Sequence, residues 1–168
     1  MTLTDLLTQK KPIIIGRWLR VIFDSYPPET AIFLKKEKDR FDNPMGSLIT
    51  EGIEKLYETL LVEMETDQVL AALDEIIRIR ALQNFSPGQA LAFIFLLKDV
   101  IRQELAKELR EVDPEELLEL ESRIDGLALL GFEVYTTRRE KLNEIRINEM
   151  KNRVSGLMRR TGLNLDPS

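Results

Sequence analysis

The residue types that most often carry enzyme chemistry are missing from this sequence. The chain has 168 residues and contains no histidine and no cysteine. Histidine is the commonest general base and metal ligand, and cysteine supplies thiolate nucleophiles, thiolate metal ligands and disulfides. We therefore expect a protein that is not an enzyme and that holds no haem, metal ion or other cofactor.

Carboxylates are the most numerous groups that could act as acids, bases or cation ligands. Two sets of glutamates lie at helical spacing: Glu51, Glu54 and Glu58, and Glu115, Glu116 and Glu119. Helical bundles that hold two iron ions use a Glu-x-x-His motif, which a chain without histidine cannot form. We interpret both sets as solvent-exposed helix faces.

A more specific group of polar residues surrounds the start of a predicted helix. Arg80 follows Leu73 and Ile77 on one apolar stripe, so it should point inward, and Lys98 follows apolar residues of the next helix in the same way. Charged side chains on an apolar face need partners. The free amides at a helix start also suit an anion. Two interpretations remain open, a small ligand or anion site and an internal network with carboxylates or carbonyls. The candidate residues are Arg80, Gln83, Ser86, Gln89 and Lys98.

The hydrophobic pattern is helical along the whole chain. A length of 168 residues with 43% hydrophobic residues fits one globular domain. Serine, asparagine or aspartate followed by proline marks three helix starts, at residues 43–44, 86–87 and 113–114. Residues 90–97 are apolar on every side, which predicts a central helix surrounded by others. We predict an all-α bundle of six to seven helices with a body over residues 1–135.

The last helix is too long for such a body. From Pro114 to about Arg160 only glycines interrupt it, and unbroken it would reach roughly 70 Å. It either breaks near Gly126–Gly131 and folds back, or projects as an extension over residues 136–168. Late apolar residues at helical spacing favour projection towards a partner and a homodimer. The candidate interface residues are Leu142, Ile145, Ile147, Met150, Val154 and Leu157.

Charge is distributed unevenly. The net charge is −5, yet residues 136–160 hold eight basic and three acidic side chains. This stretch is either a solvated face with cations near a helix C-terminus, or a contact surface for an acidic protein partner. The acidic body would repel phosphate, so we expect no nucleic-acid binding. There is no signal-peptide pattern and no apolar run of about 20 residues. We therefore expect a cytoplasmic location and no membrane insertion.

Three segments carry a resemblance to a known family. The first is Gly16-Arg17-Trp18-Leu19, which runs on to Tyr26-Pro27. The second is residues 79–90, Ile-Arg-Ala-Leu-Gln-Asn-Phe-Ser-Pro-Gly-Gln-Ala, together with residues 93–98. The third is Arg-Arg-Glu-Lys at 138–141 with Arg-Ile-Asn-Glu at 146–149. The chain resembles the N-terminal domain of the RsbT co-antagonist proteins, the RsbRD N-terminal family, over most of residues 12–158.

The resemblance implies a dimeric helical sensory or protein-interaction domain, related to haem-free globin folds. Relatives precede STAS or histidine kinase domains and pass a signal through the last helix, whereas others stand alone and are encoded near a membrane complex of sulfite reduction. Because no output domain follows in this sequence, we expect a stand-alone regulatory domain that acts through a protein partner. The alternative is a docking or accessory protein of a redox or metabolic membrane complex of the sulfite-reduction type.

Overall fold

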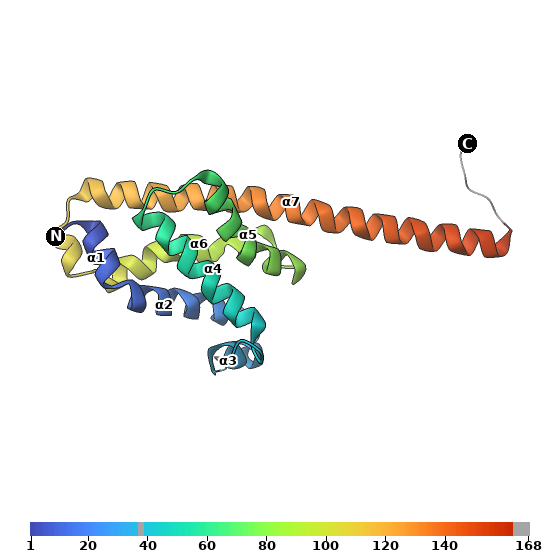
Figure 1. Ribbon diagram of the computed structural model, residues 1–168, viewed down its shortest axis with the longest axis horizontal. Helices are drawn as coiled ribbons and strands as arrows, with labels where there is room; N and C mark the ends of the chain where they lie inside the picture. Colours follow the sequence, from blue (N-terminus) through green and yellow to red (C-terminus); the bar gives the residue numbers. More distant parts are fainter. Residues whose placement is uncertain (37–38, 163–168) are drawn as a thin grey trace.

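The computed structural model describes residues 1–36 and 39–162, and this part of the chain is helical throughout (Figure 1). Its elements are α1 (Leu3–Gln9), α2 (Lys11–Asp24), α3 (Pro28–Lys36), α4 (Pro44–Leu61), α5 (Thr66–Leu82), α6 (Pro87–Glu104), the 3₁₀ turn η1 (Glu108–Arg110) and α7 (Pro114–Thr161). No strand occurs among the described residues. The all-α prediction with six to seven helices and a long C-terminal helix is confirmed.

The three helix starts that the sequence marks with a polar residue before proline lie where they are predicted. The Asn43 side chain accepts a hydrogen bond from the Gly46 amide at the start of α4. Asp113 does the same for the Glu115 amide at the start of α7. The first amides of a helix have no hydrogen-bond partner inside the helix. These side chains supply a partner for one of them and so stabilise the first turn.

Long-range hydrogen bonds of aromatic side chains join the helices of the body. Trp18 of α2 is fully buried, and its indole N–H donates to the carbonyl of Phe93 in α6 at 2.7 Å. The hydroxyl of Tyr57 in α4 donates to the carbonyl of Leu7 in α1 at 2.8 Å, and burial raises the pKa of this hydroxyl. α7 packs mainly on α5 and α6, α4 on α5, and α2 on α6.

One expectation about α6 is wrong. Residues 90–97 do not form a helix buried on every side. Phe93 and Leu97 lie in the core, but the side chains of Phe95 and Leu96 are 51% and 40% exposed. The main neighbours of α6 are α2 and α7. They leave a third, apolar face of α6 open to solvent.

α7 is one continuous helix of 48 residues and does not break at Gly126–Gly131. Gly131 allows close packing instead, because a Cβ there would lie 3.1 Å from side-chain carbons of Leu91 and Ile94. The last buried residue of α7 is Tyr135, and beyond it the helix projects far from the body (Figure 1). We call residues 136–161 the extension. None of the helices in the described part of the chain has both the length and the apolar character needed to cross a bilayer.

Candidate functional site

Arg80 lies in the core of the body, as predicted, with 1% of its surface exposed. Its Nε donates to the carbonyl of Ala90 at 3.1 Å. Its Nη2 donates to the carbonyl of Gln89 at 2.9 Å and to the hydroxyl of Ser25 at 3.1 Å. The guanidinium therefore joins α5 to the start of α6 and to the end of α2.

Aromatic rings complete the surroundings of the Arg80 side chain. The carbon at the centre of the guanidinium lies 4.5 Å from the ring centroid of Phe85, 5.6 Å from that of Tyr26 and 5.7 Å from that of Phe93. Burial lowers the pKa of Arg80. Burial also raises the pKa of Tyr26, an effect that the nearby arginine opposes. In the part of the chain that the structure describes, Arg80 forms no ion pair, and its Nη1 has no hydrogen-bond partner. Carbonyls and rings, rather than carboxylates, hold this cation.

The other predicted polar residues have separate tasks. The Ser86 hydroxyl accepts from the Gln89 amide at 3.2 Å, and the Gln89 side chain accepts from the Ser86 amide at 3.0 Å, so both side chains serve the capping of α6. Gln83 lies at the exposed end of α5 and donates to the sulfur of Met45 at 3.1 Å. These three side chains are exposed and do not reach the Arg80 guanidinium, and a ligand at this place stays a prediction.

Lys98 does not join this cluster. It forms an ion pair with Asp125 of α7, and 23% of its side chain is exposed. Phe95 is one of the apolar residues that precede Lys98 in its helix, and the structure shows it to be half exposed. The inward interpretation of Lys98 is therefore wrong, because its side chain lies at the edge between α6 and α7.

We call Arg80, the groups of Ser25, Gln89 and Ala90 that it binds, and the rings of Tyr26, Phe85 and Phe93 the Arg80 cluster. The loop between α5 and α6 links this cluster to α7, a link that the sequence did not predict. The Phe85 carbonyl accepts a hydrogen bond from the hydroxyl of Tyr135. The side-chain oxygen of Asn84 accepts from Arg139 at 3.3 Å and from Arg146 at 3.5 Å. Asn84 has a φ of +59°, the left-handed region in which asparagine is enriched. An asparagine just before a helix cap was the one available signal for this contact.

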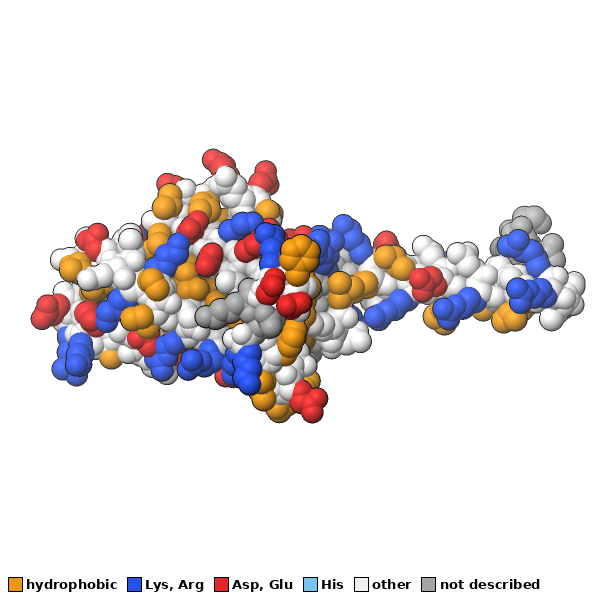
Figure 2. Space-filling model, turned by 60° about the horizontal axis from the view of Figure 1, so that its bottom comes forward, with side chains coloured by type: hydrophobic (Ala, Val, Ile, Leu, Met, Phe, Trp, Pro, Cys, Tyr) orange, Lys and Arg blue, Asp and Glu red, His pale blue; other side chains and the backbone are white. Residues whose placement is uncertain are grey.

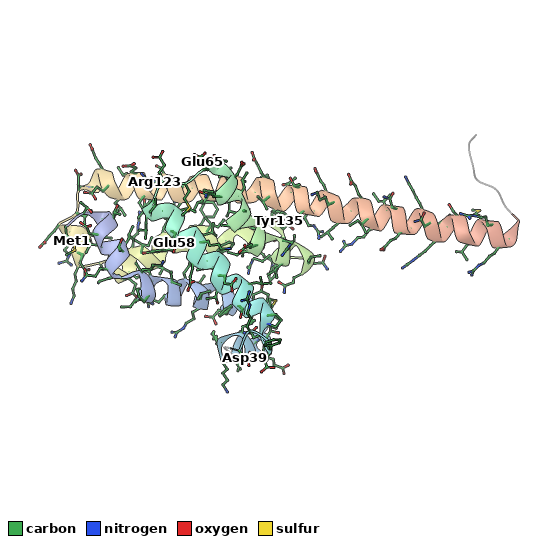
Figure 3. The ribbon with its side chains drawn as sticks, viewed as in Figure 1. Met1, Asp39, Glu58, Glu65, Arg123 and Tyr135 are labelled. Carbon is green, nitrogen blue, oxygen red and sulfur yellow. The ribbon has the colours of Figure 1, made fainter. Side chains whose placement is uncertain are left out.

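An ion pair fastens the first turn of the extension to the body. Arg138 donates from Nε to Asp74 Oδ1 at 2.7 Å and from Nη2 to the second carboxylate oxygen. This pairing raises the pKa of Arg138. Figure 3 shows Tyr135 at the point where α7 leaves the body, and the side chains beyond it radiate away from the helix.

Past these anchors the extension exposes large apolar side chains. The exposed fractions are 55% for Ile145, 51% for Ile147, 65% for Met150, 45% for Val154 and 61% for Leu157, and Leu142 is half-buried. Four of them, Ile147, Met150, Val154 and Leu157, alternate at spacings of three and four residues and share one face. Ile145 lies on another face. Figure 2 shows apolar side chains among basic ones along this arm.

The body also carries a pocket of about 550 Å³ between α2, α3 and α4. Leu19, Phe23 and Leu34 are among its apolar lining residues, and Arg20 lines it as well. A sensor of small molecules is expected to enclose its ligand. This pocket is open to solvent, so it does not by itself indicate a sensor.

A family model described as the RsbT co-antagonist protein rsbRD N-terminal domain matches residues 12–150. The match takes in most of the body, the Arg80 cluster and the first half of the extension. No curated protein and no solved structure gives a significant match. The chain belongs to the RsbT co-antagonist protein RsbRD N-terminal domain family, and this membership indicates a regulatory role in stress signalling.

Proposed function

We propose that this chain is a non-enzymatic, dimeric regulatory module that acts through protein–protein contacts of α7. The family supports a regulatory role. The observation that carries the proposal is the stripe of Ile147, Met150, Val154 and Leu157, which is 45–65% exposed on a helix that has left its own body.

The energetics of helices favour a partner for this stripe. Most of the stability of a protein helix comes from packing of an apolar face rather than from intrinsic propensity. Burying one large aliphatic side chain stabilises by about 1.5–3 kcal/mol. Among the described residues, the hydrogen bond between the extension and the body that lies furthest along α7 is that of Arg146 with Asn84. Beyond it the stripe is exposed in the described structure, and we infer that another chain covers it.

The contacts around Phe85 give the body a route to influence the extension. The Phe85 ring packs on the Arg80 guanidinium, while its carbonyl binds Tyr135 at the base of the extension. The neighbouring Asn84 binds Arg139 and Arg146. A rearrangement of the Arg80 cluster would therefore change where the extension leaves the body. We propose that this connection passes the signal.

A second candidate function rests on the charge of the extension. Residues 136–160 hold eight basic and three acidic side chains. The chain would then be a docking or accessory protein, with the basic extension bound to an acidic surface of a redox or metabolic complex of the sulfite-reduction type. Electrostatic docking of this kind weakens steeply as salt increases.

Sedimentation equilibrium at micromolar concentration tests the proposed function. We expect a dimer for the full chain and a much weaker association for a variant that ends at Tyr135. Far-UV circular dichroism of the shortened variant checks that its body is still folded. A full-length chain that stays monomeric at high concentration would contradict the proposal.

A further inference from the structure

The charge of α7 changes sign at the middle of the helix. Residues 114–135 hold six acidic residues and one basic residue, whereas the extension holds eight basic and three acidic ones. Because α7 runs from Pro114 to Thr161, its midpoint lies between residues 137 and 138. The last buried residue, Tyr135, is close to the same point. The acidic half on the body, residues 114–135, and the basic extension in solvent, residues 136–161, are therefore of similar length.

Exposed apolar residues continue along one face through both halves. In the acidic half Leu118, Leu129 and Phe132 are 64%, 72% and 52% exposed. An α-helix turns by 100° per residue, so Leu118 and Leu129 point in the same direction from the helix axis as Ile147 and Val154, to within about 20°. Phe132 and Met150 lie together about 60° to one side of Leu129. The stripe of the extension thus has a counterpart on the acidic half.

α6 widens this face beside the acidic half. Four residues of α6, Leu91, Ala92, Phe95 and Leu96, line a shallow depression of about 490 Å³ together with Phe132 of α7. The lining is almost entirely apolar. An exposed patch of this kind on a soluble domain marks an interaction site. Its position next to the stripe of α7 suits a helix laid along the α6–α7 edge.

We propose that the occupant of this edge is the extension of a second copy, running antiparallel to α7. The inference rests on the proposed dimer and adds its orientation. If the two α7 helices overlap along their whole length, Leu118 of one chain lies opposite Leu157 of the other, and Leu129 lies beside Ile147. The acidic half extends over about 33 Å and the extension over about 39 Å, so the extension is long enough to cover the acidic half.

Charge decides between the antiparallel and the parallel arrangement. The three-and-four spacing of Ile147, Met150, Val154 and Leu157 suits either one. A parallel pair would set the two basic halves against each other, with Arg146, Lys151 and Arg153 repelling their copies, and would also juxtapose the acidic halves. The antiparallel pair places each basic half against an acidic one, so that charge attraction replaces repulsion at both ends.

Distance measurements between spin labels test the orientation. The chain has no cysteine, so a single substitution introduces one label per protomer. Thr137→Cys and Asn152→Cys are suitable because both residues are exposed and lie off the stripe. In the antiparallel dimer the labels at 137 lie close to the symmetry axis, and those at 152 are separated by about 44 Å along the helices. In a parallel dimer both pairs would be separated only by the interaxial distance of about 10 Å and the label arms.

Each outcome of pulsed electron paramagnetic resonance has one meaning. A short distance at 137 with a long one at 152 supports the inference. Short distances at both positions would overturn the orientation and leave the dimer intact. Long distances at both, in a protein that sediments as a dimer, would mean that another face pairs. A monomer would contradict both the inference and the proposed function.

Salt dependence gives an independent readout of the same inference. Raising the salt concentration from 50 to 500 mM shortens the screening length from about 14 Å to about 4 Å. The antiparallel dimer loses attraction, so its Kd should rise several-fold. A Kd that falls on addition of salt would indicate relief of repulsion, as in a parallel pair, and would overturn the inference.

Discussion

Replacing Arg80 with methionine should lower the free energy of unfolding by about 2–4 kcal/mol. Methionine keeps much of the side-chain volume but cannot donate hydrogen bonds. The variant therefore loses the three bonds to Ala90, Gln89 and Ser25. It also loses the cation that packs against the Phe85 ring at 4.5 Å. Urea denaturation followed by circular dichroism measures the effect.

Arg78 provides the matched control, because it lies in the same helix and is exposed. Arg78→Met should change stability by no more than about 0.5 kcal/mol, as is usual for surface positions. Equal and small effects of the two substitutions would show that the Arg80 cluster does not hold the body together. If Arg80→Met stabilised the protein and abolished its association with a partner, the cluster would have a functional rather than a structural role.

Glutamate at both Ile147 and Val154 should raise the dimer Kd by at least about 100-fold, which corresponds to roughly 2.7 kcal/mol. Four buried aliphatic side chains per dimer would be replaced by carboxylates that must lose their hydration on pairing. Sedimentation equilibrium gives the Kd. The fold of the body should not change, because both side chains point into solvent from a segment beyond the body.

A control variant separates the apolar stripe from the added charge. Asn148→Glu with Ser155→Glu adds the same two carboxylates at exposed positions outside the stripe. We expect this control to change the Kd by only a few-fold. If both double variants weakened the dimer equally, net charge rather than apolar packing would govern association.

Local sequence signals were sufficient for the three helix starts that carry a proline and for the burial of Arg80. Ser86 and Gln89 cap their helix through contacts three residues apart, so no tertiary information was needed. Arg80 could be placed from helical phase alone, because the stripe of Leu73 and Ile77 has to face the core. The length of the last helix left two possibilities, a break at the glycines or projection, and its late apolar residues favoured projection, which the structure shows.

The features that the sequence did not predict depend on contacts between distant segments. The hydrogen bond from Tyr135 to Phe85 joins residues 50 positions apart, and the hydrophobic periodicity of the sequence does not predict such a contact. The exposure of Phe95 and Leu96 was missed for a related reason. An apolar run indicates that a helix will be covered, but it does not say whether the cover comes from the same chain. In the proposed dimer, the extension of the second chain covers this open face of α6.

Hydrogen–deuterium exchange of the full-length chain is the most direct test of the central claim that the extension is a contact element. An isolated helix of this length is marginal in water, whereas a packed helix protects its amides. We expect amides of residues 147–161 to be protected at micromolar concentration, and the protection to disappear on dilution and in the Ile147→Glu, Val154→Glu variant. Rapid exchange over these residues at every concentration, unchanged by the substitutions, would contradict the account.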